Sequence, residues 1–132
     1  MSTPFDPKVM PGADDRAKAL ETVAIAIAQV KLLAVYAQTQ DDAIEARQRG
    51  LRPVMPLVHA ENDVLSSQHY DLGDIERSLP SYLNDLNGRQ IALKLGQPGS
   101  LAPLPGVPAD VQAYVQSIKD GKPYVEPVHT GV

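Results

Sequence analysis

Apolar residues gather in one long stretch near the N-terminus. Over residues 14–48 they recur at the spacing of an α-helix, with Pro11 and Gly12 before the stretch and Gly50 and Pro53 after it. This pattern predicts a single helix over about residues 14–48. At 1.5 Å per residue it would be about 52 Å long, whereas the mean helix has about 11–12 residues.

The middle of this helix is apolar on more than one side. Residues 23–37 contain two strongly polar side chains, Gln29 and Lys31. On a helical wheel one stripe holds Leu20, Val23, Ile27, Val30 and Ala34, and a second holds Ile25, Leu32 and Tyr36. A helix that is apolar nearly all round is normally buried all round. Polar residues including Lys18 and Glu21 interrupt any window of about 20 residues that could span a bilayer, so we expect protein, and no membrane, to cover this helix.

The middle of the chain gives weaker signals. Residues 51–60 contain two prolines and are predicted to be extended, and residues 61–73 are predicted to form a loop. Apolar residues at helical spacing predict a short helix over about 79–87, with Pro80 in its first turn. The alternation over residues 89–95 predicts one isolated strand.

The remaining segments are rich in proline. Residues 97–108 are predicted to be a polyproline-like connector, and a third helix is expected over about 108–120. We therefore expect a mainly α chain, forming a single domain over residues 1–132. Extended arms are expected at its N-terminus (1–11) and its C-terminus (122–132).

Composition narrows the classes of function. The 132 residues include 12 prolines and no cysteine, and 12 Lys and Arg against 16 Asp and Glu give a net charge of −4. Nucleic-acid binding relies on clustered basic residues, so no direct nucleic-acid binding is expected. Without cysteine there is no disulfide, thiolate nucleophile or cysteine metal site. Residues 1–11 have no apolar run, so neither a signal peptide nor an anchor is expected.

Candidate chemistry is sparse. The three histidines are His59, His69 and His129. Residues 59–69 also hold carboxylates and are the nearest approach to a ligand cluster, but the spacing matches no metal-binding signature. No nucleophile motif or phosphate-binding loop is present. No catalytic residue, metal or cofactor is therefore predicted, and we expect the chain not to be an enzyme.

A long apolar helix with proline-rich arms predicts a chain whose burial is completed by neighbouring subunits. We expect a structural subunit of a large assembly, specifically a bacteriophage virion component such as a head-decoration, head-completion or tail-adaptor protein. Such a component would be assembled in the host cytoplasm. The alternatives are a small accessory subunit of a multisubunit enzyme complex and a self-assembling helical homo-oligomer, both cytoplasmic. Partners would be other subunits, including copies of itself, through Leu20, Val23, Ile27, Val30, Leu32, Ala34, Tyr36, Tyr114 and Tyr124.

Overall fold

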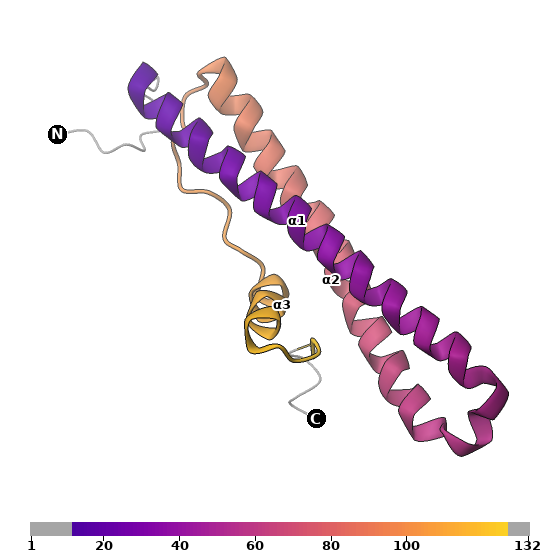
Figure 1. Cartoon of the computed structure of the whole chain (residues 1–132). Helices are drawn as coiled ribbons and strands as arrows, with labels where there is room; N and C mark the ends of the chain where they lie inside the picture. The colour runs from indigo at the N-terminus through magenta and orange to yellow at the C-terminus, as the bar shows by residue number, and fades with distance from the viewer. Residues whose placement is uncertain (1–11, 127–132) are drawn as a thin grey trace. The chain divides into compact units, whose positions relative to one another are not determined.

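The computed structural model describes residues 12–126, and these are mainly helical. In chain order the elements are α1 (Ala13–Leu51), a short 3₁₀ helix η1 (Arg52–Leu57), α2 (His59–Leu95) and α3 (Ala109–Asp120) (Figure 1). The predicted N-terminal arm and the last six residues of the C-terminal arm lie outside the described residues.

The chain divides into two compact units, each built from two separate segments. The first unit is Met1–Leu32 with Pro80–Gly106, and the second is Leu33–Leu79 with Val107–Val132. In α2 the division falls at Pro80, which cannot donate the backbone hydrogen bond that an inner helical residue normally makes.

In the first unit the core comes from α1 and α2. Its buried apolar residues are Val23, Ile27, Val30, Tyr82, Leu86 and Leu93. The guanidinium of Arg89 on α2 donates to the carbonyl oxygens of Ala102 and, at 3.2 Å, Pro103. Gly96, with a φ of 67°, ends α2 in the left-handed conformation that glycine adopts readily. These contacts hold the connector against the helix that precedes it.

In the second unit α3 completes the core. Its buried apolar residues are Ala37, Leu51, Leu72, Ile75, Leu79, Val111, Tyr114 and Tyr124. The Tyr114 hydroxyl donates to Gln40 Oε1 on α1 at 3.0 Å, and the rings of Tyr114 and Tyr124 meet edge to face at 5.6 Å. Ser78 on α2 donates to a carboxylate oxygen of Asp110. Aromatic packing and side-chain hydrogen bonds therefore attach α3 to both other helices.

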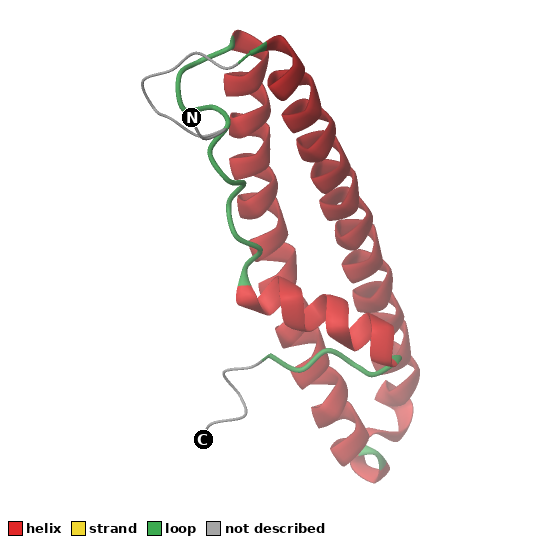
Figure 2. Cartoon of the chain, turned by 90° about the vertical axis from the view of Figure 1, so that its left-hand side faces the viewer, coloured by secondary structure: helices red, strands yellow, loops and turns green. Residues whose placement is uncertain are grey.

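The predicted strand over residues 89–95 is wrong. This segment is the last part of α2, and Figure 2 shows helices and loops but no strand in the described part of the chain. Leu93 is buried, whereas Ile91 and Leu95 are exposed. An alternating strand would place all three on one face. The helix instead continues the inward positions of Tyr82 and Leu86, and its backbone hydrogen bonds need no partner strand.

Three other expectations for the middle of the chain are corrected in the same way. Residues 52–57 form η1 and are not extended, and the predicted loop over 61–73 and short helix over 79–87 are both parts of α2. The short helix was expected to end at about residue 87, but α2 continues through Gly88. Glycine inside a helix costs about 1 kcal/mol, which burial of Leu86 and Leu93 outweighs.

Candidate functional site

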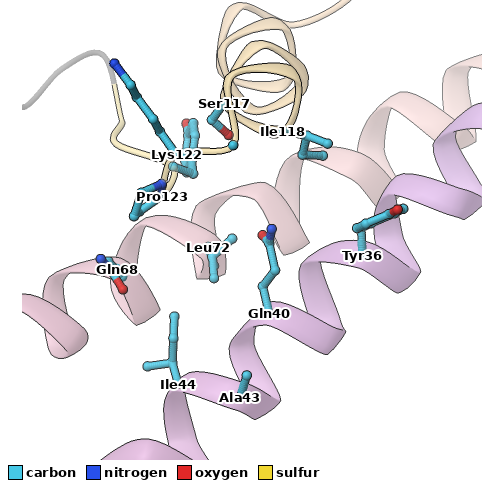
Figure 3. Close-up of a pocket in the computed structure, with 12 residues that line it drawn as sticks. Tyr36, Gln40, Ala43, Ile44, Gln68, Leu72, Ser117, Ile118, Lys122 and Pro123 are labelled. Carbon is cyan, nitrogen blue, oxygen red and sulfur yellow. The ribbon is translucent and has the colours of Figure 1, made fainter.

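The second unit contains a groove between its three helices. The groove is lined by residues of all three helices and of the segment after α3 (Figure 3). They are Tyr36, Gln40, Ala43 and Ile44 of α1, Gln68 and Leu72 of α2, Ser117 and Ile118 of α3, and residues 121–124. Its cavity of about 590 Å³ is within the range of small-molecule sites. The lining combines apolar side chains with the amides of Gln40 and Gln68, and it contains no carboxylate and no imidazole. The side chain of Lys122, its one charged member, points away from the cavity in Figure 3. The groove therefore offers shape and apolar contact, together with amide and hydroxyl groups.

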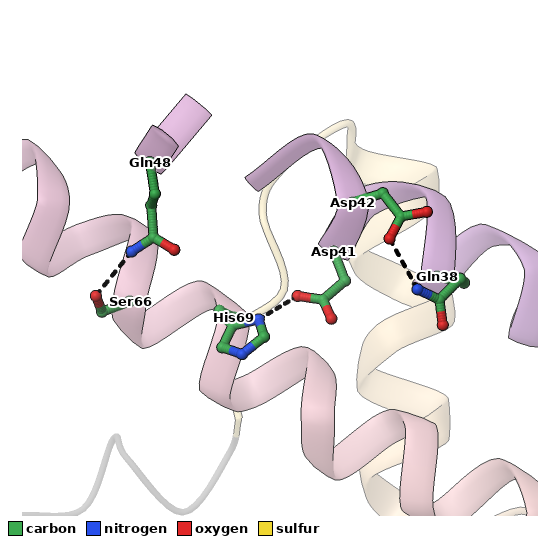
Figure 4. A network of polar contacts seen from close by, with 6 residues as sticks. All are labelled: Gln38, Asp41, Asp42, Gln48, Ser66 and His69. Carbon is green, nitrogen blue, oxygen red and sulfur yellow. Dashed lines mark hydrogen bonds and ion pairs between the residues drawn. The ribbon is translucent and has the colours of Figure 1, made fainter. Parts of the chain in front are cut away.

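A polar cluster lies between α1 and α2 in the same unit. His69 Nδ1 contacts Asp41 Oδ1, and Asp41 is buried while the imidazole is half-exposed (Figure 4). Burial raises the pKa of the nearby Glu76 carboxyl, and the charge and hydrogen bond of Asp41 raise it further. The charge of His69 lowers the pKa of Glu76, and the charge of Asp42 raises it. Two carboxyl groups thus share a partly desolvated site with one imidazole.

The pKa of Glu76 makes stability depend on pH. In the folded state the pKa of Glu76 is raised above its usual value of 4.5. The folded chain therefore binds a proton on the Glu76 carboxyl more tightly than the unfolded chain does. The resulting stabilisation is present below pH 4.5 and is lost as the pH rises through the raised pKa. Glu76→Gln should remove this loss, so urea unfolding at pH 7 should show a more stable variant with a flatter pH dependence.

Glu45→Gln is the matched control for this prediction, because Glu45 is exposed on α1 in the same unit. It should change neither the stability at pH 7 nor its slope with pH. Equal pH slopes for the wild type and Glu76→Gln would contradict the placement of Glu76 beside Asp41.

Residues 59–69, the nearest approach to a ligand cluster in the sequence, are helical in the structure. They form the first turns of α2, where His59 contacts Asp63 at 3.2 Å and His69 contacts Asp41. Among the described residues no group of three or more metal-ligating side chains could hold an ion. His129 lies outside them.

The two predicted tyrosine contacts are part of the core. Burial raises the pKa of Tyr114 to about 12 and also raises that of Tyr124. Both phenols are therefore neutral at physiological pH. Both tyrosines fasten α3 and the segment after it to the rest of the second unit.

The predicted interface residues of α1 divide between two faces. Val23, Ile27 and Val30 are buried within their own chain, and Leu20 is partly buried. The others, Leu32, Ala34 and Tyr36, are exposed. Most of the first stripe is thus covered by the chain itself.

The second stripe belongs to an apolar face that the described residues leave uncovered. Ile25 is 54% exposed, Leu32 59%, Val35 63% and Tyr36 47%. With the exposed Ala28 between them, these residues are the outer face of α1. Val35 was not among the predicted site residues, although its spacing of three from Leu32 and ten from Ile25 is a signal that places it on this face.

The N-terminal helical segment is also long and apolar enough to cross a membrane, judged by length and composition alone. This segment is Ala13–Leu57, and only 11% of its most apolar part is buried. A soluble core helix can pass the same test, although such a helix is mostly buried.

Comparisons of the chain with protein-family models, with curated proteins and with solved structures find no match.

Proposed function

We propose that this chain is a non-enzymatic structural subunit of a protein assembly, and that the outer face of α1 binds another subunit. The exposure of Ile25, Leu32, Val35 and Tyr36 on one helix carries the proposal. Single exposed apolar residues are common on protein surfaces, but contiguous apolar patches mark sites of association. The first stripe of the same helix already supplies the intramolecular core.

The exposed area is large enough to matter energetically. Fully burying one Val, Leu or Ile side chain is worth about 1.5–3 kcal/mol relative to leaving it exposed. Three such residues and a tyrosine therefore favour association by several kcal/mol before the entropic cost of binding is subtracted. The groove of the second unit, whose lining contains neither a carboxylate nor an imidazole, supports a binding role over a catalytic one.

The specific form of this proposal is a bacteriophage virion component, as the sequence predicts. An accessory subunit of an enzyme complex is the alternative within the same class. Both candidates use the same face for protein contacts. Identifying the assembly in which the chain resides would distinguish one candidate from the other.

A second candidate is a helix that enters a membrane, and the length and hydropathy of Ala13–Leu57 favour it. Two observations weigh against it. Lys31 lies inside the apolar stretch, and a charge at the bilayer centre costs about 2.5–3.5 kcal/mol or more. In addition, Val23, Ile27 and Val30 already pack inside the chain.

The test introduces a charge on the outer face. Leu32→Asp should leave the helical circular dichroism spectrum unchanged because Leu32 is exposed in the free chain. It should weaken binding at least about a hundredfold, because burying an unpaired carboxylate in an interface costs several kcal/mol. When the tagged full-length chain is expressed in its source cell, the wild type should co-sediment with an assembly and Leu32→Asp should sediment as free chain.

Ser67→Asp is the matched control, since it adds the same charge at an exposed polar position of α2. It should co-sediment like the wild type. Retention of Leu32→Asp in the assembly would contradict the proposal, and flotation of the wild type with phosphatidylcholine vesicles would favour the membrane candidate.

A further inference from the structure

The exposed side of α1 follows the spacing of a coiled-coil seam. Eight exposed positions alternate by three and four residues, and we call them the α1 seam: Lys18, Glu21, Ile25, Ala28, Leu32, Val35, Thr39 and Asp42. This spacing averages 3.5 residues, which keeps one stripe of a helix facing a partner helix. The four central positions are apolar and the four outer ones are polar. All eight positions lie on the single helix α1.

We propose that the occupant of the α1 seam is a second copy of this chain, whose α1 packs antiparallel to the first. This inference rests on the proposed function and names the partner. With the two-fold axis at the level of Val30, residue n of one copy faces residue 60 − n of the other. Ile25 then faces the partner's Val35, and Ala28 faces the partner's Leu32. The small side chain of Ala28 leaves room for the larger leucine, as knobs-into-holes packing requires.

The charges at the ends of the seam select this orientation. In the antiparallel pair Lys18 faces the partner's Asp42, and symmetry repeats this contact at the other end. A parallel pair would instead place Lys18 against the partner's Lys18 and Asp42 against the partner's Asp42. Like charges in direct opposition are destabilising. Lys31 flanks the seam near the axis, and its long side chain can extend to solvent on either side.

The same residues select the register. Shifting the antiparallel pair by one heptad would place either Asp42 against the partner's Ile25 or Lys18 against the partner's Val35. Each shift would bury a charge against an apolar side chain, which costs several kcal/mol. The register centred on Val30 is the one that matches apolar with apolar positions and opposite charges with each other.

The length of the apolar part favours a helix over a lipid bilayer as the occupant. From Ile25 to Val35 the seam rises about 15 Å at 1.5 Å per residue. The hydrocarbon core of a bilayer is about 30 Å thick, so Lys18, Glu21 or Asp42 would enter it. A second α1, which is apolar over the same length and charged beyond it, matches the face at both ends.

The absence of cysteine from the sequence allows a clean cross-linking test on the full chain. A mixture of Ile25→Cys and Val35→Cys chains should form a disulfide-linked dimer under mild oxidation. Either variant alone should not, because two copies of residue 25 would lie about 15 Å apart along the axis, beyond the reach of a disulfide. A parallel pair would give the reverse result, with each variant linking to itself.

Charge exchange tests the ends of the seam independently. Lys18→Glu and Asp42→Lys should each weaken the dimer about tenfold in sedimentation equilibrium, since each replaces two attractive contacts with two repulsive ones. The double variant Lys18→Glu/Asp42→Lys restores opposite charges and should return the dissociation constant to within about threefold of the wild type.

The outcomes separate this inference from the proposed function. A wild type that is monomeric at every concentration, together with no cross-link in the mixture, would overturn self-pairing. If Leu32→Asp is nevertheless lost from the native assembly, the proposed function stands and a different protein occupies the seam. Flotation of the wild type with phosphatidylcholine vesicles would overturn both in favour of a membrane.

Discussion

Replacing Leu93 with alanine should cost about 2–5 kcal/mol of stability, as truncation of a buried leucine in a packed core usually does. Leu93 is 1% exposed, whereas Leu95, two residues later on α2, is 65% exposed. Leu95→Ala should therefore change the free energy of unfolding by no more than about 0.5 kcal/mol. Urea unfolding of the two full-length variants measures both values.

This pair distinguishes the helix from the strand because the chemical change is identical at both positions. In a strand with one buried face, Leu93 and Leu95 would share that face and both substitutions would be costly. Ile91→Ala extends the comparison, since Ile91 is exposed in the helix. Equal and large losses at positions 91, 93 and 95 would contradict the course of α2.

Tyr114→Ala should release α3 from the second unit. The side chain is fully buried, donates to Gln40 on α1 and packs edge to face on Tyr124. Truncation of a buried aromatic residue costs about 3–5 kcal/mol, and the loss falls on the contacts that attach α3. Trypsin should then cleave faster after Lys119, and the amides of α3 should exchange faster with deuterium.

Two further variants serve as controls for Tyr114→Ala. Tyr114→Phe keeps the ring and removes the hydrogen bond to Gln40, so it should cost about 0.5–1.5 kcal/mol and leave cleavage nearly unchanged. Tyr70→Ala removes an exposed tyrosine of α2 and should have no effect on α3. If Tyr114→Ala leaves the cleavage rate unchanged, other contacts hold α3 in place.

The first and third helices could be predicted from residues at or near their ends. α1 continues through Gly50 and ends at Leu51, two residues before Pro53, and α3 follows Pro108 and is capped by Gly121, whose φ is 66°. Pro53, Pro108 and Gly121 act on the backbone next to these helix ends. For the same reason the C-terminal boundary of α3 matches the sequence-based expectation.

Most of α2 was missed because its local signals contradict its tertiary contacts. Pro80 and Gly88 are helix breakers by propensity, and the sequence between residues 61 and 73 is polar. The signal that could have identified the helix is longer in range. Its buried apolar residues are spaced by three, four or seven from one to the next: Leu72, Ile75, Leu79, Tyr82, Leu86 and Leu93. Tertiary packing of this stripe overrides two unfavourable residues.

The candidate interface was found only in part for a related reason. Two apolar stripes were visible on α1, but the sequence of one helix does not say which of them its own chain covers. That choice depends on the side from which the other helices approach. Ile27 and Leu32 are equally apolar in the sequence, yet one is buried and the other is exposed.

The connection through η1 has a consequence for the order in which the chain folds. Next to this turn, Arg47 pairs with Glu61 at 2.7 Å and Gln48 donates to Ser66 at 2.9 Å. These contacts close a short loop, whereas the two segments of the first unit are separated by all of Leu33–Leu79. Closing a short loop loses less chain entropy than closing a long one, and local contacts form faster. Contacts between α1 and α2 are therefore expected to form first in the second unit, next to η1, so that the first unit is the last to close.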